Sequence, residues 1–510
     1  MFSDIEIRAY PYEEKRMKFV STRGGHCVTG AEAIVKGIAP DGGLYVPEVF
    51  PQISEEEIQS MLEMDYVERA ATVLYKFLDE FDKEELLSEL KAVYSRFDGD
   101  PAPLVRIDEG KYILELFHGP TCAFQDMALG ILPYLVTKSA KLLGIKEKLL
   151  VLAATSGDTG KAALESFRDR EGVKIQVFYP EEGVSAMQKL FLATQEGNNL
   201  SVIAVKGNFD DCQSAVKTVF TSEEYIQKVK AKGYLFSSAN SINIGRLLPQ
   251  IAYYVSAYCD LVSSEQIVCG EEADFTVPTG NFGNILAAYY AKQMGLPVGR
   301  LLCASNKNNV LTDFIRTGAY NAKRTFYRTM SPSMDILLSS NLERLVFELA
   351  GRDAALTNER MSSLSATGKY NITPEELKNL RSQFSAGFTS EDDTVECIYE
   401  YFTEYGYPMD THTGVGMSVA DRYLEKRDPL APKHVMVIVS TASPYQFPQD
   451  VLYALSGNDV KDSFKCVKRI NLLTAMKVPD AIRNVRYKPV LFKTSVAPNQ
   501  IGAEVLKFVE

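Results

Sequence analysis

The sequence predicts an α/β protein built on a mostly parallel β-sheet with helices on both faces. Short apolar segments alternate with segments of helical periodicity between residues 112 and 304, and one more apolar strand follows at residues 434–440. This alternation is typical of parallel sheets, because the chain has to cross back over the sheet between parallel strands and usually does so as a helix. Ligands of such sheets bind beyond the carboxyl ends of the strands, so the loops after the strands are where a site is expected.

Helical segments are expected ahead of this region, followed by a break. Residues 66–78 and 83–94 carry apolar side chains at helical spacing, and the turn-rich residues 97–103 suit a domain boundary. The expected strands of the alternating region are residues 112–116, 148–153, 174–179, 200–205, 274–277 and 300–304. The expected helices are residues 127–143, 161–167, 187–195 and 283–292, and residues 330–425 are expected to be mainly helical.

Length and charge narrow the class of protein. The chain has 510 residues, enough for two to four domains of about 100–200 residues each, and its net charge is -11. That charge argues against a protein that binds nucleic acid or an anionic membrane through bulk charge. No nearly charge-free stretch is long enough to span a bilayer, and residues 1–16 contain no apolar secretory core, so a cytoplasmic protein is expected. Residues 1–16 suit an N-terminal extension, with Met17 as an alternative start.

Several common catalytic and metal-binding patterns are missing from the sequence. The eight cysteines are scattered without a CxxC pair, which predicts free thiols and no metal site. Neither a GxSxG nucleophile elbow nor an HExxH zinc motif occurs. The chemistry is therefore expected in the loops that follow the strands.

Three such loops stand out. Residues 155–160 (TSGDTG) combine hydroxyls with the free amides of a helix start, which suits an anion such as a carboxylate; the alternative is a helix start capped by its own side chains. Residues 278–284 (PTGNFGN) suit a phosphate, although they match neither dinucleotide nor P-loop patterns; the alternative is a tight turn. Residues 114–126 (LELFHGPTCAFQD) contain His118 in a turn, where a histidine is more often a structural hydrogen-bonding group than a catalyst.

Taken together, ten motifs resemble the threonine synthase family of pyridoxal-phosphate enzymes, whose fold is fold type II, or tryptophan synthase β-like. They occur in family order and cover nearly the whole chain from Met17 onward. They are STRG (21–24), APDGGLYVPE (39–48), ELFHGPT (115–121), ATSGDTG (154–160), YPEEGVSAMQKL (179–190), NFDDCQ (208–213), SSANSINIGR (237–246), PTGNFGN (278–284), DTHTGVG (410–416) and STASP (440–444). Any one of these is weak evidence, whereas ten in the right order are very specific.

The resemblance implies a fold and a domain organisation. Residues 17–100 correspond to the family's helical N-terminal domain, and residues 101–510 to a catalytic core of two α/β subdomains around a cleft. The smaller subdomain covers about residues 130–250, and its closure on the larger one would exclude water. The chain is expected to be a monomer or a homodimer.

The resemblance also implies a reaction and a set of site residues. The family converts O-phospho-L-homoserine and water into L-threonine and phosphate, the last step of threonine biosynthesis, as a carbon–oxygen lyase with pyridoxal 5′-phosphate as cofactor. The residues expected at the cofactor are Gly280, Asn281, Phe282, Gly283 and Asn284 for its phosphate and Thr441 for its ring nitrogen. The residues expected at the substrate are Ser156, Gly157, Asp158 and Thr159 for its carboxylate, the segment with Asn240, Ser241 and Asn243, and the cations Lys161 and Arg246 for its phosphate.

One departure affects catalysis directly. In the family, the lysine that holds the cofactor as a Schiff base and shuttles protons lies in a Phe-Lys-Asp sequence, where this chain has Phe124-Gln125-Asp126. The amide nitrogen of Gln125 is not nucleophilic, so the cofactor would have to be held non-covalently or by another residue. A second family lysine is replaced by Gln446.

Three explanations of Gln125 remain open from the sequence. The chain is an engineered or sequencing variant of an active enzyme, a natural and catalytically degraded paralogue, or an enzyme in which another lysine substitutes. Lys138 and Lys141 lie more than three helical turns further on, which makes them poor substitutes. Two functions follow: a threonine synthase, or an inactive paralogue that binds pyridoxal phosphate or an amino acid and has a non-enzymatic interaction role.

Overall fold

The N-terminal part of the chain combines a small antiparallel sheet with helices. The computed structural model describes residues 16–510, apart from residues 156, 182–183, 208, 429 and 431–432. The small sheet has the order β2-β1-β3 and consists of β1 (Lys18–Ser21), β2 (Cys27–Thr29) and β3 (Tyr45–Pro47). The helices here are α1 (Gly30–Lys36), α2 (Glu55–Met61), α3 (Tyr66–Phe77) and α4 (Lys83–Tyr94).

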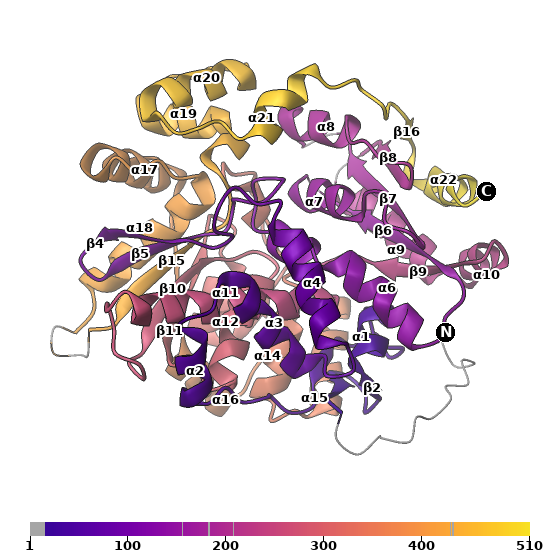
Figure 1. Ribbon diagram of the computed structural model, residues 1–510, viewed down its shortest axis with the longest axis horizontal. Helices are drawn as coiled ribbons and strands as arrows, with labels where there is room; N and C mark the ends of the chain where they lie inside the picture. Colours follow the sequence, from indigo (N-terminus) through magenta and orange to yellow (C-terminus); the bar gives the residue numbers. More distant parts are fainter. Residues whose placement is uncertain (1–15, 156, 182–183, 208, 429, 431–432) are drawn as a thin grey trace.

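A six-stranded mixed sheet forms the centre of the larger part of the molecule, on the left in Figure 1. Its order is β14-β11-β10-β15-β5-β4, and only β4 runs antiparallel to its neighbour. The strands are β4 (Leu104–Asp108), β5 (Lys111–Glu115), β10 (Ala273–Pro278), β11 (Val298–Ser305), β14 (Phe384–Phe388) and β15 (Val435–Ser440). Val437 and Val439 pack on the side of α11 (Ile244–Ser263) and α12 (Gly283–Gln293), and Met436 and Ile438 on the opposite side with α18 (Thr411–Glu425), so both faces are covered.

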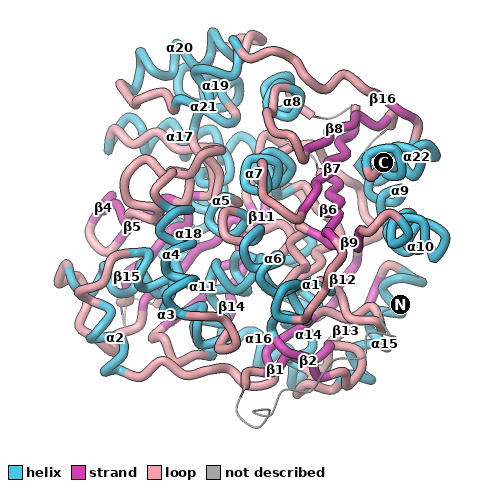
Figure 2. Tube along the Cα trace, turned by 45° about the vertical axis from the view of Figure 1, so that its right-hand side comes forward, coloured by secondary structure: helices cyan, strands magenta, loops and turns pink. Residues whose placement is uncertain are grey.

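A second, five-stranded parallel sheet lies beside the first, on the right in Figure 1. Its order is β16-β8-β7-β6-β9, with β6 (Lys148–Ala154), β7 (Val173–Pro180), β8 (Leu200–Val205), β9 (Tyr234–Ser238) and β16 (Ser495–Val496). Figure 2 shows α6 (Leu132–Leu142) and α7 (Asp158–Phe167) on one side of it, and α9 (Phe209–Thr221), α10 (Glu223–Ala231) and α22 (Ile501–Phe508) on the other. The last strand and helix show that the C-terminal segment returns to complete this unit.

The remaining elements connect and cover the two sheets. A two-stranded antiparallel ribbon joins β12 (Ala319–Asn321) to β13 (Lys369–Asn371). The other helices are α5 (Asp126–Leu129), α8 (Ala186–Ala193), α13 (Val310–Thr317), α14 (Leu342–Leu349), α15 (Ala354–Thr367), α16 (Pro374–Gln383), α17 (Glu391–Tyr405), α19 (Pro448–Ser456), α20 (Ser463–Thr474) and α21 (Asp480–Asn484). No helix within the described residues is long and apolar enough to cross a membrane.

The α/β prediction is confirmed, with corrections in detail. The single helix expected at residues 127–143 is wrong: α5 and α6 are separate, because Pro133 at the start of α6 has no amide hydrogen to continue a helix. A β-carbon on Gly130, between them, would lie 2.5 Å from Cγ1 of Val93, so α4 packs closely at the break. Helix α7 begins at Asp158, earlier than expected.

The sequence prediction missed several short strands, and it also named no helix over α9, α10 and α11, the last of which has 20 residues. The N-terminal sheet and β13 consist of strands of three or four residues, which are too short to show a period of two. Strand β14 lies inside the region expected to be mainly helical. All eight cysteines are free, as predicted, and the described residues contain no cluster of side chains that could hold a metal ion. The proposed boundaries at residues 16 and 100 and the smaller unit of about residues 130–250 stay predictions.

Candidate functional site

The loop after β10 presents an uncapped helix start. Strand β10 ends at Pro278 and α12 begins at Gly283, with Phe282 in the left-handed conformation (φ 64°) and no side chain capping the helix. The carbonyl groups of the loop are used by neighbours: Ser339 Oγ donates to Gly280 O (2.7 Å) and Asn341 Nδ2 to Asn281 O (3.0 Å). Amides at the start of a helix carry partial positive charge, so this loop suits a phosphate group.

The segment that carries Gln125 lies along the end of β15. Phe124 N donates to Thr441 O (2.9 Å), and Ser443 N donates to Cys122 O (3.0 Å). Gln125 precedes the short helix α5 and is 7% exposed, and its Oε1 atom is buried without a hydrogen-bond partner. The segments that contain Gln125 and Thr441, which are far apart in sequence, therefore lie side by side.

The carbonyl oxygen of Thr121 accepts hydrogen bonds from two side chains that come from other parts of the sequence. Lys161 Nζ, from α7, donates to it at 2.7 Å, and Gln446 Nε2 donates to it as well. Asp126 accepts hydrogen bonds from the backbone N and the Oγ1 of the same threonine (2.7 and 2.8 Å). Burial raises the pKa of Asp126 to about 6 and lowers the pKa of Lys161.

The loop between β6 and α7 is held by a threonine of the loop itself and by a residue from the part of the molecule that contains the six-stranded sheet. Thr155 Oγ1 accepts hydrogen bonds from Gly157 N (3.0 Å) and Gly160 N (2.9 Å), so its side chain serves the first turn of α7, where Gly157 has no side chain to cap the helix. Asp158 Oδ1 accepts from Gln188 Nε2 (3.2 Å), and its Oδ2 accepts from Ser333 Oγ (3.0 Å). The half-buried Thr159 follows in the first turn of α7, and Ser156 lies outside the described residues.

Residues 240–246 lead from β9 into α11. Ser241 Oγ accepts from Asn341 Nδ2 (3.4 Å), and the half-buried Asn240 donates its backbone N to Ser238 Oγ (3.2 Å). The side chain of Asn243 caps α11 through Gly245 N and donates to two backbone carbonyls, so all its polar groups serve the fold.

Arg246 is a buried cation with little pairing. It is 3% exposed, donates through Nη1 to Ala239 O (2.7 Å), and leaves its Nε without a partner. Within the part of the chain that the structure describes, no carboxylate lies at ion-pair distance from it. Burial lowers the pKa of its guanidinium to about 10, and the group still remains charged at neutral pH. An anionic ligand would satisfy it.

Four residues that the sequence prediction missed join these loops. Ser333 connects Asp158 to the loop after β10, because its hydroxyl donates to Asp158 and its carbonyl oxygen would lie 2.6 Å from a β-carbon on Gly280. Asn341 connects Ser241 to Asn281. The hydroxyls of Tyr253 and Tyr254 both donate to Asn284 Oδ1 (2.5 and 2.6 Å). No motif points to these residues, since each acts through a contact distant in sequence.

A histidine supports the Ser333 contact from the other side. Ser333 N donates to His412 Nε2 (3.1 Å), and His412 Nδ1 is 2.6 Å from Asp410 Oδ2. Acceptance at Nε2 requires the proton of a neutral imidazole on Nδ1, where it bonds the carboxylate. The DTHTG motif therefore positions the serine that crosses to Asp158.

Some buried polar atoms of these loops have no hydrogen-bond partner. Four buried atoms contributed by these loops have no hydrogen-bond partner: Gln125 Oε1, Arg246 Nε, Asn284 Nδ2 and Gln446 Oε1. An orphaned buried polar group costs about 1–3 kcal/mol, so a polar ligand that reached any of these atoms would remove that cost.

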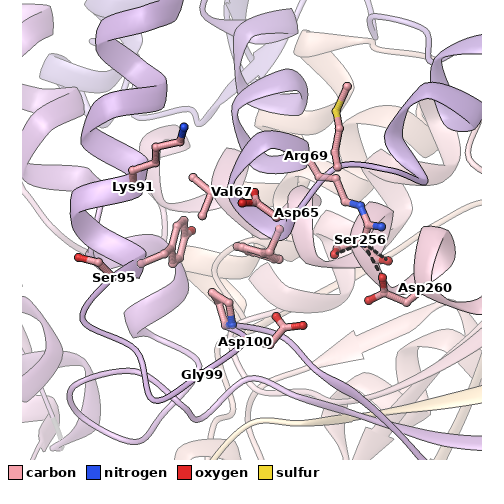
Figure 3. Close-up of a pocket in the computed structure, with 13 residues that line it drawn as sticks. Asp65, Val67, Arg69, Lys91, Ser95, Gly99, Asp100, Ser256 and Asp260 are labelled. Carbon is pink, nitrogen blue, oxygen red and sulfur yellow. Dashed lines mark hydrogen bonds and ion pairs between the residues drawn. The ribbon is translucent and has the colours of Figure 1, made fainter. Parts of the chain in front are cut away.

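A separate cavity of about 480 Å³ lies between α3, α4 and α11 (Figure 3). Its lining includes Asp65, Arg69, Lys91, Asp100 and Asp260, and none of the predicted site residues. Arg69 forms an ion pair with Asp260 across 2.5 Å. The site is therefore defined by the convergent loops and not by this cavity.

Comparison with known proteins places these features in a family. Residues 18–94 match the model "Threonine synthase N terminus", and residues 98–441 match "Pyridoxal-phosphate dependent enzyme". The chain is 38% identical over 445 residues to threonine synthase-like 1 of Homo sapiens, an alignment that covers 85% of this chain but 59% of that protein. It is 37% identical over 440 residues to threonine synthase of Pseudomonas aeruginosa, covering 85% of this chain and 90% of that one.

Solved structures agree with the sequence matches. The crystal structure of pyridoxal-phosphate-bound threonine synthase from Brucella melitensis superposes with a TM-score of 0.85 at 35% identity, covering 97% of this chain and 100% of that one. The yeast threonine synthase structure gives a TM-score of 0.85 at 29% identity over 96% and 98% of the two chains. The likeness thus extends over nearly the whole length of both chains.

Proposed function

Because the chain belongs to the threonine synthase family of pyridoxal-phosphate-dependent enzymes, we propose that it binds O-phospho-L-homoserine and converts it with water into L-threonine and phosphate. The observation that carries the proposal is the convergence of the predicted loops. Asp158 and Gly280 meet at Ser333, Ser241 and Asn281 meet at Asn341, and Lys161 meets the Gln125 segment at Thr121.

Pyridoxal phosphate is the cofactor of this family, and the residues present fit it. Asn284 Nδ2 is orphaned at the start of α12, whose first turn is uncapped, and the absence of a β-carbon on Gly280 lets the backbone of Ser333 pack against the loop. We assign Gly280–Asn284 to the phosphate group and Thr441 to the ring nitrogen. A neutral hydroxyl at that nitrogen leaves it without a proton, unlike a carboxylate. When bound, the cofactor supplies an electron sink for carbanions of the amino acid.

The other residues bind and orient the substrate. Backbone amides of Asp158 and Thr159 at the start of α7 suit its carboxylate, and Arg246 suits its phosphate. Gln188 and Ser333 hold the carboxylate of Asp158 from both sides, which fixes the loop against the larger unit. The phosphate group and the carboxylate of the substrate would thus be held at separate ends of the site.

A second candidate function follows from Gln125. Its buried carboxamide, with Oε1 unpartnered, can accept a hydrogen bond from a ligand but cannot form a covalent bond to the cofactor or move a proton at neutral pH. A protein with this residue and no replacement lysine would bind pyridoxal phosphate with an amino acid and release no product.

Replacing Gln125 by lysine is expected to raise phosphate release from O-phospho-L-homoserine by about 100-fold, the usual contribution of a positioned acid–base group. The measurement is the initial rate of phosphate release with saturating pyridoxal phosphate. Gln227→Lys, at an exposed position on α10, is the matched control and should leave the rate unchanged. A Gln125→Lys protein that binds the cofactor covalently but releases no phosphate would rule out the proposed reaction.

Replacing Ser333 by alanine is expected to weaken binding of O-phospho-L-homoserine by about 1.5 kcal/mol, or roughly tenfold in Kd. The carboxylate of Asp158 would then keep only its bond to Gln188, so the substrate loop would lose its contact with the larger unit. Calorimetric titration of the cofactor-loaded protein measures the change. Ser363→Ala, at a half-buried serine on α15 whose hydroxyl donates to Lys369 O, serves as control, and equal affinities for both variants would contradict this role.

A further inference from the structure

Lys161 is the one lysine with a buried side chain in the part of the chain that the structure describes. It is 4% exposed, although lysines are almost never fully buried unless they are paired. Its Nζ atom donates to Thr121 O at 2.7 Å and lies 3.4 Å from the centre of the Phe191 ring. Among the described residues, no carboxylate lies within ion-pair distance of this atom.

This environment makes the amine easier to deprotonate than the amine of an exposed lysine. Removing an ammonium from water without a counter-ion is costly, and a lysine responds by losing its proton more easily. Burial accordingly lowers the pKa of Lys161. Neutral lysine amines in such surroundings are the nucleophiles that attack carbonyl groups.

The amine also lies against the segment where the family lysine is missing. Thr121 precedes Gln125 by four residues, and Asp126 binds both N and Oγ1 of Thr121, so the turn around Gln125 is closed on itself. Gln446, which replaces the second family lysine, donates to the same carbonyl oxygen as Lys161. The segment is hydrogen-bonded to the end of β15 and to Thr441, the residue assigned to the cofactor ring.

We propose that Lys161 replaces the missing lysine and forms the covalent bond to pyridoxal phosphate. The neutral Nζ amine adds to the aldehyde carbon of the cofactor, a C–N bond forms, and water leaves with the aldehyde oxygen and the two amine hydrogens, giving a C=N double bond. No electrons are exchanged with a third reactant. The inference rests on the proposed cofactor pocket and names its attachment residue.

The contacts of Lys161 favour this role over the substrate-phosphate role expected from the sequence. A phosphate on Nζ would approach the Thr121 carbonyl oxygen, and both carry negative charge or lone pairs. The Nε atom of Arg246 has no hydrogen-bond partner, so we assign this group to the phosphate. Lys161 is thus left for the aldehyde.

Lys292 provides a matched control within the chain. It is half-buried, donates to Gly299 O at 2.7 Å, and burial lowers its pKa too. It lies near the C-terminal end of α12, against the start of β11, which is the opposite end of the sheet from the site. A half-buried lysine with a lowered pKa but far from the site should not bind the cofactor.

The experiment uses the full chain with one equivalent of pyridoxal phosphate, reduction with sodium borohydride, and peptide mass spectrometry to locate the pyridoxyl group. We expect the label on Lys161. Lys161→Met should reduce total labelling at least about tenfold, whereas Lys292→Met should leave it unchanged. A label on another lysine, or a label spread over exposed lysines, would overturn the proposal.

A double variant separates this inference from the proposed function. Gln125→Lys with Lys161→Met should carry the label at position 125, which would show that the pocket folds and binds the cofactor without Lys161. If that variant is labelled but the natural chain is not, the attachment to Lys161 is wrong and the cofactor pocket stands. If neither is labelled and neither binds the cofactor, both the inference and the pocket are wrong.

Discussion

Replacing Arg246 by glutamine is expected to remove the preference of the protein for O-phospho-L-homoserine over L-homoserine. The expected loss is about 3 kcal/mol in the binding free energy of the phosphate ester, or roughly 100-fold in Kd. Arg246 is buried, has an unpartnered Nε, and has no carboxylate at ion-pair distance within the described residues. A phosphate contributes far more binding free energy when it pairs with such a buried cation than when it pairs with an exposed, hydrated one.

The measurement is a pair of calorimetric titrations of the cofactor-loaded protein, one with each amino acid. Arg69→Gln is the matched control, because Arg69 is equally buried but already paired with Asp260 in a different region. That variant should lose stability and keep the preference for the ester. If Arg246→Gln weakened both ligands equally, the assignment of Arg246 to the phosphate would be wrong.

Replacing Gly280 by alanine is expected to weaken binding of pyridoxal phosphate by about 2 kcal/mol, or roughly 30-fold in Kd, without unfolding the protein. A β-carbon at this position would lie 2.6 Å from Ser333 O and 3.2 Å from Cδ1 of Ile336. The first of these is a backbone atom and cannot rotate away, so the loop itself has to move. That movement would displace the amides at the start of α12.

Cofactor titration followed by absorbance measures the change. Gly25→Ala is the control, since a β-carbon there meets nothing within 4 Å. Because Ser333 also bonds Asp158, the Gly280→Ala protein should in addition bind the amino acid more weakly. Unchanged cofactor affinity in Gly280→Ala would contradict the assignment of this loop to the phosphate.

The positions of the loops were predictable because hydrophobic periodicity is local. Strands at residues 148–153 and 434–440 are continuous apolar runs, and they appear as β6 and β15 with ends shifted by at most one residue. In a parallel sheet the loops at the carboxyl ends of the strands face the same region. The sequence therefore determined the α/β class and the loops that form the site, and ten ordered motifs determined the family.

The contacts between these loops depend on the tertiary structure alone. Lys161 and Gln446 reach the backbone carbonyl oxygen of Thr121 from 40 and 325 residues away. Ser333 and Asn341 stand in no recognisable motif, yet they join loops that come from different sheets. The family resemblance predicts that Gln125 occupies the position of a lysine. Only burial showed that Lys161, beside Gln125, has no carboxylate at ion-pair distance among the described residues, because solvation depends on all the neighbours that folding assembles and not on the order of residues.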